Sequence, residues 1–171
     1  MNWLQRRSVW AVFCIAPLLG ACDAEMILEE WWFKGTTKGV SLCKARGTDQ
    51  GVSNNTIQEV CVKKHQKLIH PSVDGTAGFA KDIGVAYFRG SLENKSTDYV
   101  ITSYTISVTH KSAPDKTTIK AFEHRWVEPH ESNYFYIENN DLKFKPEKPE
   151  DFENDSLDWS IPTILGVQIS F

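Results

Sequence analysis

The chain has 171 residues, a formal net charge of −3 and 12% aromatic residues. This length suits one modest domain with a single hydrophobic core. The mildly acidic charge offers no electrostatic basis for binding nucleic acid, and the sequence lacks the basic patch that holds a protein against anionic lipid.

The first residues have the features of an export signal. Arg6 and Arg7 form a positive head, and residues 8–19 are almost entirely apolar. This run is shorter than the roughly 20 residues that a membrane-spanning helix needs. It ends in Leu19-Gly20-Ala21-Cys22, which resembles the lipobox of bacterial lipoproteins. The resemblance implies cleavage before Cys22 and attachment of lipid, including palmitate, to the cysteine sulfur.

The same resemblance implies a location. Residues 1–21 become a signal peptide, and residues 22–171 become a single extracytoplasmic domain that is lipid-anchored on the periplasmic face of the bacterial envelope. Asp23 favours the inner membrane, and the outer membrane stays an alternative.

Cleavage after Ala24 by an ordinary signal peptidase is disfavoured, because it places Cys22 where that enzyme prefers a small residue. Loss of two arginines changes the formal net charge from −3 to −5.

The four cysteines agree with export. Cys14 leaves with the signal and Cys22 becomes the anchor, so Cys43 and Cys61 remain as a pair. In an oxidising compartment such a pair is expected to form a disulfide. A Cys43–Cys61 bond closes a loop of nearly twenty residues, which contributes about 3 kcal/mol in the chain-entropy model.

A metal site that uses the same cysteines is the alternative. Cys43, Cys61, His65 and His70 form a possible two-cysteine, two-histidine set, but the chain has no C-x2-C pair. An oxidising compartment also favours the disulfide over zinc thiolates. We therefore predict no metal, and we expect His65 and His70 to be surface residues at a helix end.

Residues 23–34 contain an aromatic cluster of Trp31, Trp32 and Phe33. We expect these rings to pack on the core of the domain. The alternative is that they rest at the membrane interface, where amphipathic rings are favoured. No long Gly/Ser/Pro tether separates Cys22 from the cluster, so the folded part is expected to stand close to the bilayer.

Residues 36–71 are predicted to be helical. Thr56 and Glu59 fit a capping box, and the residue before Pro71 is expected to end the second helix. An earlier, shorter helix includes Leu42 and Cys43. The turn is predicted to contain Gly47 and Gly51, and one face of the second helix combines four apolar side chains, Ile57, Val60, Cys61 and Leu68.

Residues 84–171 are predicted to form β-structure. Apolar and polar residues alternate with a period of two over residues 99–110. Residues 141–158 form a proline-containing segment with seven acidic residues and three lysines. Turn residues occur at 94–96, 113–115 and 128–130, and the strands are expected at 85–93, 99–110, 117–127, 133–138 and 163–171.

Part of this region resembles a family of small immunoglobulin-like modules in bacterial surface proteins, the FxLYD type. Residues 90–96 (GSLENKS) match the pattern G-x-[LV]-x-N-x-[ST], and residues 127–132 (VEPHES) match its later Pro-Gly-[ED]-[ST] turn, with His130 in place of the glycine. The FxLYD tetrad itself is absent. The predicted fold class is therefore α+β: a predominantly antiparallel, immunoglobulin-like β-sandwich with an N-terminal, disulfide-clamped helical segment.

The sequence contains no recognisable catalytic constellation. It has no G-x-S-x-G elbow, no glycine-rich phosphate loop and no free cysteine after processing. His124, Glu128 and His130 are close in sequence and form the best candidate set for a small periplasmic hydrolase, but their spacing is not that of H-E-x-x-H.

We therefore expect a non-enzymatic lipoprotein that binds an envelope protein or assists envelope assembly. An inhibitor or immunity protein is a sharper variant, because such proteins are often small, acidic and envelope-anchored. The expected partners are the membrane, through the lipid, and an envelope protein. We expect no nucleic acid, no cofactor and no catalytic residues.

Overall fold

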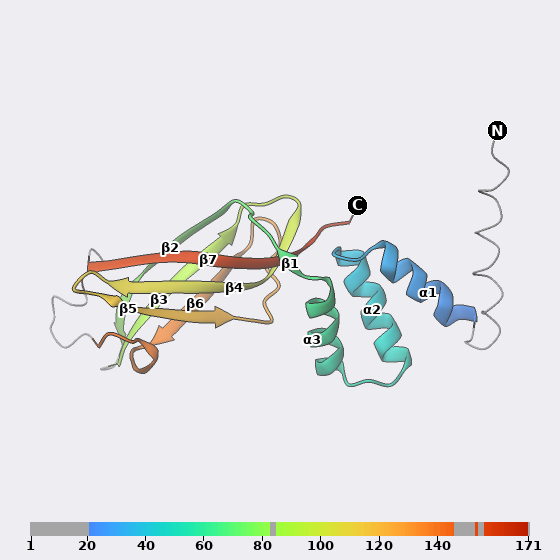
Figure 1. Cartoon of the computed structure of the whole chain (residues 1–171), viewed down its shortest axis with the longest axis horizontal. Helices are drawn as coiled ribbons and strands as arrows, with labels where there is room; N and C mark the ends of the chain where they lie inside the picture. The colour runs from blue at the N-terminus through green and yellow to red at the C-terminus, as the bar shows by residue number, and fades with distance from the viewer. Residues whose placement is uncertain (1–20, 83–84, 146–152, 154–155, 171) are drawn as a thin grey trace. The chain divides into compact units, whose positions relative to one another are not determined.

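The computed structural model describes residues 21–82, 85–145, 153 and 156–170. They form two compact units: the described residues up to His65 together with Ser170, and residues 66–169. In the described part of the chain the first unit is helical and the second is built from strands (Figure 1). No helix among these residues is both long and apolar enough to cross a membrane. Apart from Ala21, the predicted signal peptide lies outside the described residues.

The helical unit contains three α-helices, α1 (Ala21–Trp32), α2 (Thr37–Asp49) and α3 (Asn54–His65). Thr36 caps α2, because its side chain accepts a 3.2 Å hydrogen bond from the Gly39 N–H. At the start of α3, the Ser53 hydroxyl accepts a 3.4 Å hydrogen bond from the Thr56 N–H. A hydroxyl residue therefore precedes α2 and α3 and satisfies one free N–H group of each helix.

The start of α3 differs from the prediction. Ser53, rather than Thr56, is the capping residue, so the helix begins three residues earlier than a Thr56–Glu59 capping box requires. Glu59 instead pairs with Lys63 one turn later, at 2.7 Å. The turn prediction was right for Gly51, which has a φ of +69°.

Gly47, in contrast, lies inside α2 and not in the turn. A Cβ at this position would lie 2.8 Å from a side-chain carbon of Ile57. The glycine therefore permits the close approach of α2 and α3. The prediction that it lies in a turn was wrong.

The end of α3 also differs. The prediction placed it before Pro71, but the helix ends at His65, and Lys67–Leu68 form the short strand β1. The chain leaves the helix here because Lys67 and Leu68 pair with a longer strand of the β-unit and Ile69 becomes buried. Of the predicted apolar face, Ile57 and Cys61 are buried, whereas Val60 and Leu68 are exposed.

The aromatic cluster after Cys22 was also wrongly predicted to pack on the core. Residues 21–32 form α1, which we did not expect. Trp31 is 68% exposed and Trp32 is 76% exposed. Only Phe33 is partly covered, with the Lys38 ammonium 3.8 Å from its ring centre.

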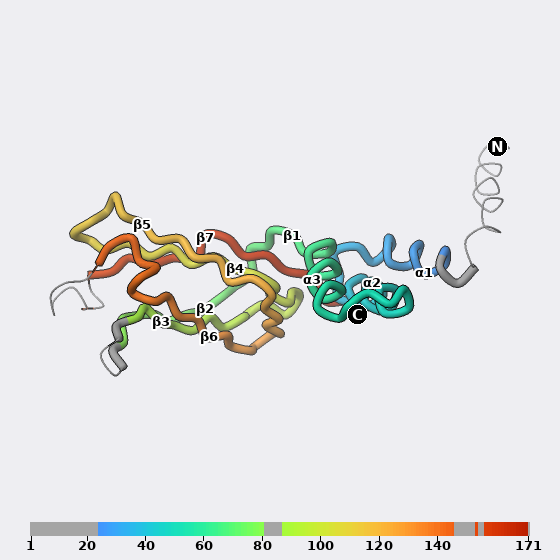
Figure 2. Tube along the Cα trace, turned by 90° about the horizontal axis from the view of Figure 1, so that it is seen from below, coloured from blue at the N-terminus to red at the C-terminus, as the bar shows by residue number. Residues whose placement is uncertain are grey.

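The β-unit contains two antiparallel sheets, with strand orders β1-β7-β4-β5 and β2-β3-β6. Figure 2 shows them as two layers of this unit. Its longer strands are β2 (Val73–Asp82), β3 (Val85–Asn94), β4 (Tyr99–His110), β5 (Ala113–Phe122), β6 (Ser132–Glu138) and β7 (Leu157–Gln168).

The core of the β-unit lies between the two sheets. Tyr104, Ile106 and Val108 of β4 are fully buried, and the serines and threonines between them are half-buried, as the alternating pattern predicts. The Tyr104 ring stacks on Phe122 with 5.3 Å between ring centres and meets Phe135 of the opposite sheet edge-on at 6.3 Å. The prediction of an α+β chain with antiparallel sheets is therefore confirmed.

Three strands differ from their predicted ranges. β2 was missed, because its glycines and alanines give no β-signal. β5 begins at Ala113 and the hairpin turns at residues 111–112, since Pro114 lies in an edge strand where no sheet N–H is required. β7 begins six residues earlier than predicted, because a bulge between Ser160 and Thr163 accommodates Pro162.

Candidate functional site

The outer face of the β2-β3-β6 sheet carries an unusual set of side chains. The sheet register places Ser91 of β3 beside Tyr134 of β6, and Arg89 beside Tyr136. Their strand neighbours Phe135 and Ile137 are buried, so the two tyrosines point away from the core. Tyr134 is 78% exposed and Tyr136 is 64% exposed.

This face is hollowed. Across β2 the register aligns Gly78 with Arg89, so the residue that lacks a side chain lies beside a long one. The resulting open concavity has a volume of about 1260 Å³. Its lining is Thr76, Ala77, Gly78, Phe79, Tyr87, Arg89, Gly90, Ser91, Tyr134, Phe135, Tyr136, Glu138 and Asn140. We call this surface the tyrosine face.

The tyrosine face has the composition of a protein-binding surface. Tyrosine and arginine are enriched at interfaces, because each combines a large apolar area with a polar group. Small serine and glycine residues beside tyrosines are typical of antibody binding loops. The opposite sheet has no comparable feature on β4, where the residues between the buried ones are Ser103, Thr105, Ser107 and Thr109.

The sequence contained a signal for this face. In β6, tyrosines at 134 and 136 alternate with buried Phe135 and Ile137, so aromatic or apolar side chains occupy both sides of one short strand. A strand at a sheet edge with one buried face should place polar residues on the other face. Outward aromatic residues at i and i+2 are therefore the pattern that could have identified the site.

The structure does not bring together the three residues of the hydrolase hypothesis, His124, Glu128 and His130. His124 is exposed and its Nε2 lies 3.7 Å from a Glu123 carboxylate oxygen. Glu128 accepts a 2.7 Å hydrogen bond from the Trp126 indole, and His130 is exposed. Within the described residues no hydrogen bond or ion pair joins His124, Glu128 and His130 to one another, and none of them lines the concavity.

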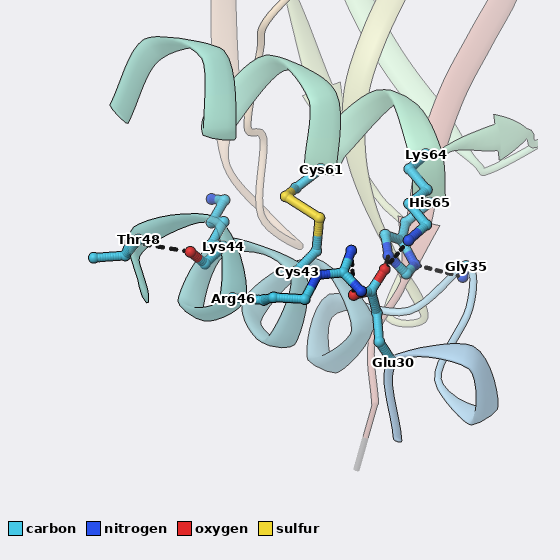
Figure 3. The surroundings of a disulfide bond; sticks show 9 residues. All are labelled: Glu30, Gly35, Cys43, Lys44, Arg46, Thr48, Cys61, Lys64 and His65. Carbon is cyan, nitrogen blue, oxygen red and sulfur yellow. Dashed lines mark hydrogen bonds and ion pairs between the residues drawn. A yellow bond between two sulfur atoms is a disulfide. The ribbon is translucent and has the colours of Figure 1, made fainter. Parts of the chain in front are cut away.

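The helical unit contains a second cluster of functional groups beside a disulfide. Cys43 of α2 and Cys61 of α3 are bonded, as the sequence predicts, and both are buried. Figure 3 shows Glu30 of α1 next to this bond, pointing at Arg46 and Lys64. The Glu30 side chain is only 2% exposed, and its carboxylate forms ion pairs with Arg46 at 3.0 Å and with Lys64.

His65 completes this cluster and corrects a prediction. It is not a surface residue but is buried, and its Nδ1 accepts a 3.1 Å hydrogen bond from the Gly35 N–H. The proton of the neutral ring therefore resides on Nε2, which lies 3.6 Å from the Glu30 carboxylate. Burial lowers the pKa of His65 and outweighs the opposing attraction of Glu30. His70, in contrast, is exposed as expected.

The ligand atoms of Glu30, Cys43 and His65 all lie within 4.8 Å of one another. This trio differs from the predicted two-cysteine, two-histidine set, since Glu30 replaces Cys61 and His70. The Cys43 sulfur is held in the disulfide, and the Glu30 carboxylate already neutralises two cations. These positive neighbours would repel a metal ion, so the arrangement serves to hold α1 on α2 and α3 through a buried carboxylate.

The core of the β-unit contains a phenol, that of Tyr104 on β4. Its hydroxyl donates a 2.7 Å hydrogen bond to the Asn133 side-chain oxygen. Burial raises the pKa of Tyr104 to about 12, so the phenol stays neutral and acts as a fixed hydrogen-bond donor. Tyr104 belongs to the β-unit and His65 to the helical unit.

The chain matches no protein-family model and no curated protein sequence. The predicted lipidation of Cys22 falls on a side chain outside the described residues, although its backbone belongs to α1. Half of the acidic segment at 141–158, namely residues 146–152 and 154–155, also lies outside them.

Proposed function

We propose that this protein is a non-enzymatic, lipid-anchored lipoprotein on the periplasmic face of the bacterial envelope, where its tyrosine face binds another envelope protein. The observation that carries the proposal is the pair of exposed tyrosines, Tyr134 and Tyr136, beside Arg89 over an open concavity. Exposed aromatic rings are costly in water unless a partner covers them, and such rings supply most of the energy at protein interfaces. An inhibitor or immunity protein is one form of this function.

Two sequence features support the envelope location. The lipobox-like Leu19-Gly20-Ala21-Cys22 provides an anchor, and the Cys43–Cys61 disulfide fits an oxidising compartment. After cleavage before Cys22, the bond also accounts for both cysteines other than the lipidated Cys22. The location thus rests on two independent features of the chain.

We also propose that the β-unit is an immunoglobulin-like module. If β2, β3 and β6 correspond to strands A, B and E, then β4, β5 and β7 correspond to C, C′ and F. Strand β1 then occupies the place of strand G, although it precedes strand A in the chain. Sheets of this kind commonly serve as scaffolds for binding.

The residues that resemble the FxLYD pattern have roles that fit this proposal. Leu92 is fully buried, and a Cβ on Gly90 would lie 2.6 Å from the Phe135 ring, so each position accepts few alternatives. His130, which replaces the glycine of the family turn, has a φ of 65°. A left-handed backbone is the conformation that favours glycine, so the substitution falls at a position where the family pattern has a physical reason.

Replacement of both exposed tyrosines tests the binding role. The full-length protein is tagged, purified from detergent-solubilised membranes, and compared with the double variant Tyr134→Ser/Tyr136→Ser. We expect a stoichiometric envelope partner whose recovery falls at least about tenfold in the double variant, as for loss of interface hot spots. The matched control is Ile119→Ser on β5, since Ile119 is 64% exposed but lies in the other sheet.

Two outcomes would contradict the binding role. One is a partner that is retained equally by the tyrosine variant and by the control. The other is catalytic turnover in a hydrolase screen that disappears in His124→Ala, which would favour an enzyme instead.

Replacement of the anchor cysteine tests the location. Cys22→Ser should prevent lipidation and signal cleavage, and inhibition of the lipoprotein signal peptidase should leave an unprocessed precursor of the unchanged protein. If mature protein with an N-terminus other than Cys22 accumulates under that inhibition, the anchor proposal is wrong.

A further inference from the structure

Helix α1 has two opposite faces. Glu30 points into the helical unit, where it pairs with Arg46 and Lys64. On the other side of α1 lie four large apolar residues that remain exposed: Ile27 at 43%, Leu28 at 55%, Trp31 at 68% and Trp32 at 76%. At about 100° per residue these four fall on a single stripe, and Glu30 lies outside it. We call this set the α1 stripe.

The α1 stripe is too apolar for a surface that faces only water. Scattered exposed hydrophobic residues are normal, but contiguous apolar patches mark binding sites for proteins or membranes. Trp31 and Trp32 lie edge to face, with 5.7 Å between ring centres, and form the widest part of the stripe. Tryptophan is the residue type that is most characteristic of the membrane–water interface, because its ring is apolar and its N–H is polar.

The position of the stripe indicates what covers it. It begins five residues after Cys22 and ends ten residues after it. At about 1.5 Å per residue, a helix standing upright on the membrane would lift Trp32 about 15 Å from the anchor, beyond an interface about 6 Å thick. A helix lying flat keeps all four side chains at the interface, because interfacial helices bury their apolar face about 5–10 Å deep.

We propose that the α1 stripe rests in the lipid interface and lays α1 flat on the membrane beside the acyl chains of Cys22. This inference rests on the lipid anchor proposed above, but not on the binding role of the tyrosine face. Glu25 and Glu29 are exposed on α1 and oppose attraction to anionic headgroups. Burial of apolar area therefore drives the contact, and zwitterionic lipid suffices.

Fluorescence quenching by brominated lipid tests this contact directly. The lipidated full-length protein is reconstituted into phosphatidylcholine vesicles whose acyl chains carry bromine near the headgroup. We expect bromine to quench the tryptophan emission of the unchanged protein. In Trp31→Tyr/Trp32→Tyr the bromine-dependent quenching should fall at least about fivefold, because a tryptophan must lie at the interface to be quenched there.

The matched control is Trp126→Tyr, since Trp126 is 40% exposed but belongs to the β-unit. This variant should retain the quenching of the unchanged protein. Far-UV circular dichroism should show that both variants keep their helices, because Trp31 and Trp32 are largely exposed and Trp126 lies outside the helical unit. Addition of anionic lipid or salt should change the quenching little.

The possible results separate this inference from the anchor. Protein that floats with the vesicles but shows no quenching overturns the α1 contact and leaves the anchor intact. Protein that does not float with vesicles overturns both. Quenching that survives in Trp31→Tyr/Trp32→Tyr also overturns the contact. A concentration-dependent dimer in detergent that this double variant abolishes would assign the stripe to a second copy of the chain instead.

Discussion

The N–H of His130 donates a 2.7 Å hydrogen bond to the carbonyl oxygen of Asn94, and the Asn94 N–H donates in turn to the Glu131 carbonyl at 2.9 Å. These bonds join the end of β3 to the turn that precedes β6. The Asn94 side chain is fully buried and adds bonds to the carbonyls of Tyr99 and Val127, at 2.8 and 2.9 Å. One asparagine thus links three separate segments of the β-unit.

Replacement of Asn94 should therefore be among the most destabilising single changes in the β-unit. Asn94→Ala removes two donated hydrogen bonds and the acceptor of the Ser96 N–H, and leaves the Val127 carbonyl with only the Ile101 N–H as its donor. We expect a loss of about 3 kcal/mol or more in the free energy of unfolding, measured by urea denaturation. Asn140→Ala is the control, since Asn140 is exposed. Equal stabilities of the two variants would contradict this role.

Replacement of His130 by glycine should stabilise the β-unit, in contrast to Asn94→Ala. The φ of 65° at His130 costs a residue with a Cβ about 1–2 kcal/mol, and glycine avoids this cost but loses more entropy on folding. We expect His130→Gly to raise the free energy of unfolding by up to about 1 kcal/mol. His124→Gly should raise the free energy of unfolding in the same way, because His124 has a φ of 56°. A His130→Gly protein that is clearly less stable than the unchanged one would contradict this account.

The sequence predicted those features that depend on local patterns. The alternation over residues 99–110 identified β4, and cysteine number and export together identified the Cys43–Cys61 bond. Features that depend on distant partners were missed. His65 is a polar residue at a helix end, and only the packing of α1 and its carboxylate Glu30 explains why it is buried.

The same reason explains the missed strands and the missed site. β2 is rich in small residues and forms a strand only because β3 pairs with it along its whole length. The tyrosine face combines residues from β2, β3 and β6, which are more than forty residues apart in the chain at their furthest. Alternation within β6 could have indicated outward aromatic residues, but the concavity beside them requires the register that aligns Gly78 with Arg89.

Loss of the disulfide should weaken the helical unit selectively. Cys43 and Cys61 are separated by 18 positions, for which the chain-entropy model gives about 3 kcal/mol. In Cys43→Ala/Cys61→Ala we expect hydrogen exchange in α2 and α3 to become faster, while β4 keeps its protection because it lies in the other unit. Uniform acceleration in both units, or none in either, would contradict this expectation.

The stability of the helical unit should fall in mild acid because of His65. Burial holds the pKa of His65 below its ordinary value of 6.5, so the folded unit binds this proton less readily than the unfolded chain does. The stabilising contribution is complete above pH 6.5 and decreases as the pH falls toward the lower pKa of the folded state. The groups that face His65 are Glu30, which favours the proton, and Lys64 and Lys34, which oppose it.

His65→Gln isolates this effect. Glutamine keeps an oxygen that accepts the Gly35 N–H but does not titrate in this range. We expect the midpoint of α-helix unfolding, followed by far-UV circular dichroism, to decrease between pH 7 and pH 5 in the unchanged protein and to decrease less in His65→Gln. His70→Gln is the matched control, because His70 is exposed, and it should keep the full decrease. If His65→Gln and His70→Gln follow the same pH curve, burial of a neutral His65 is not what makes the helical unit sensitive to acid.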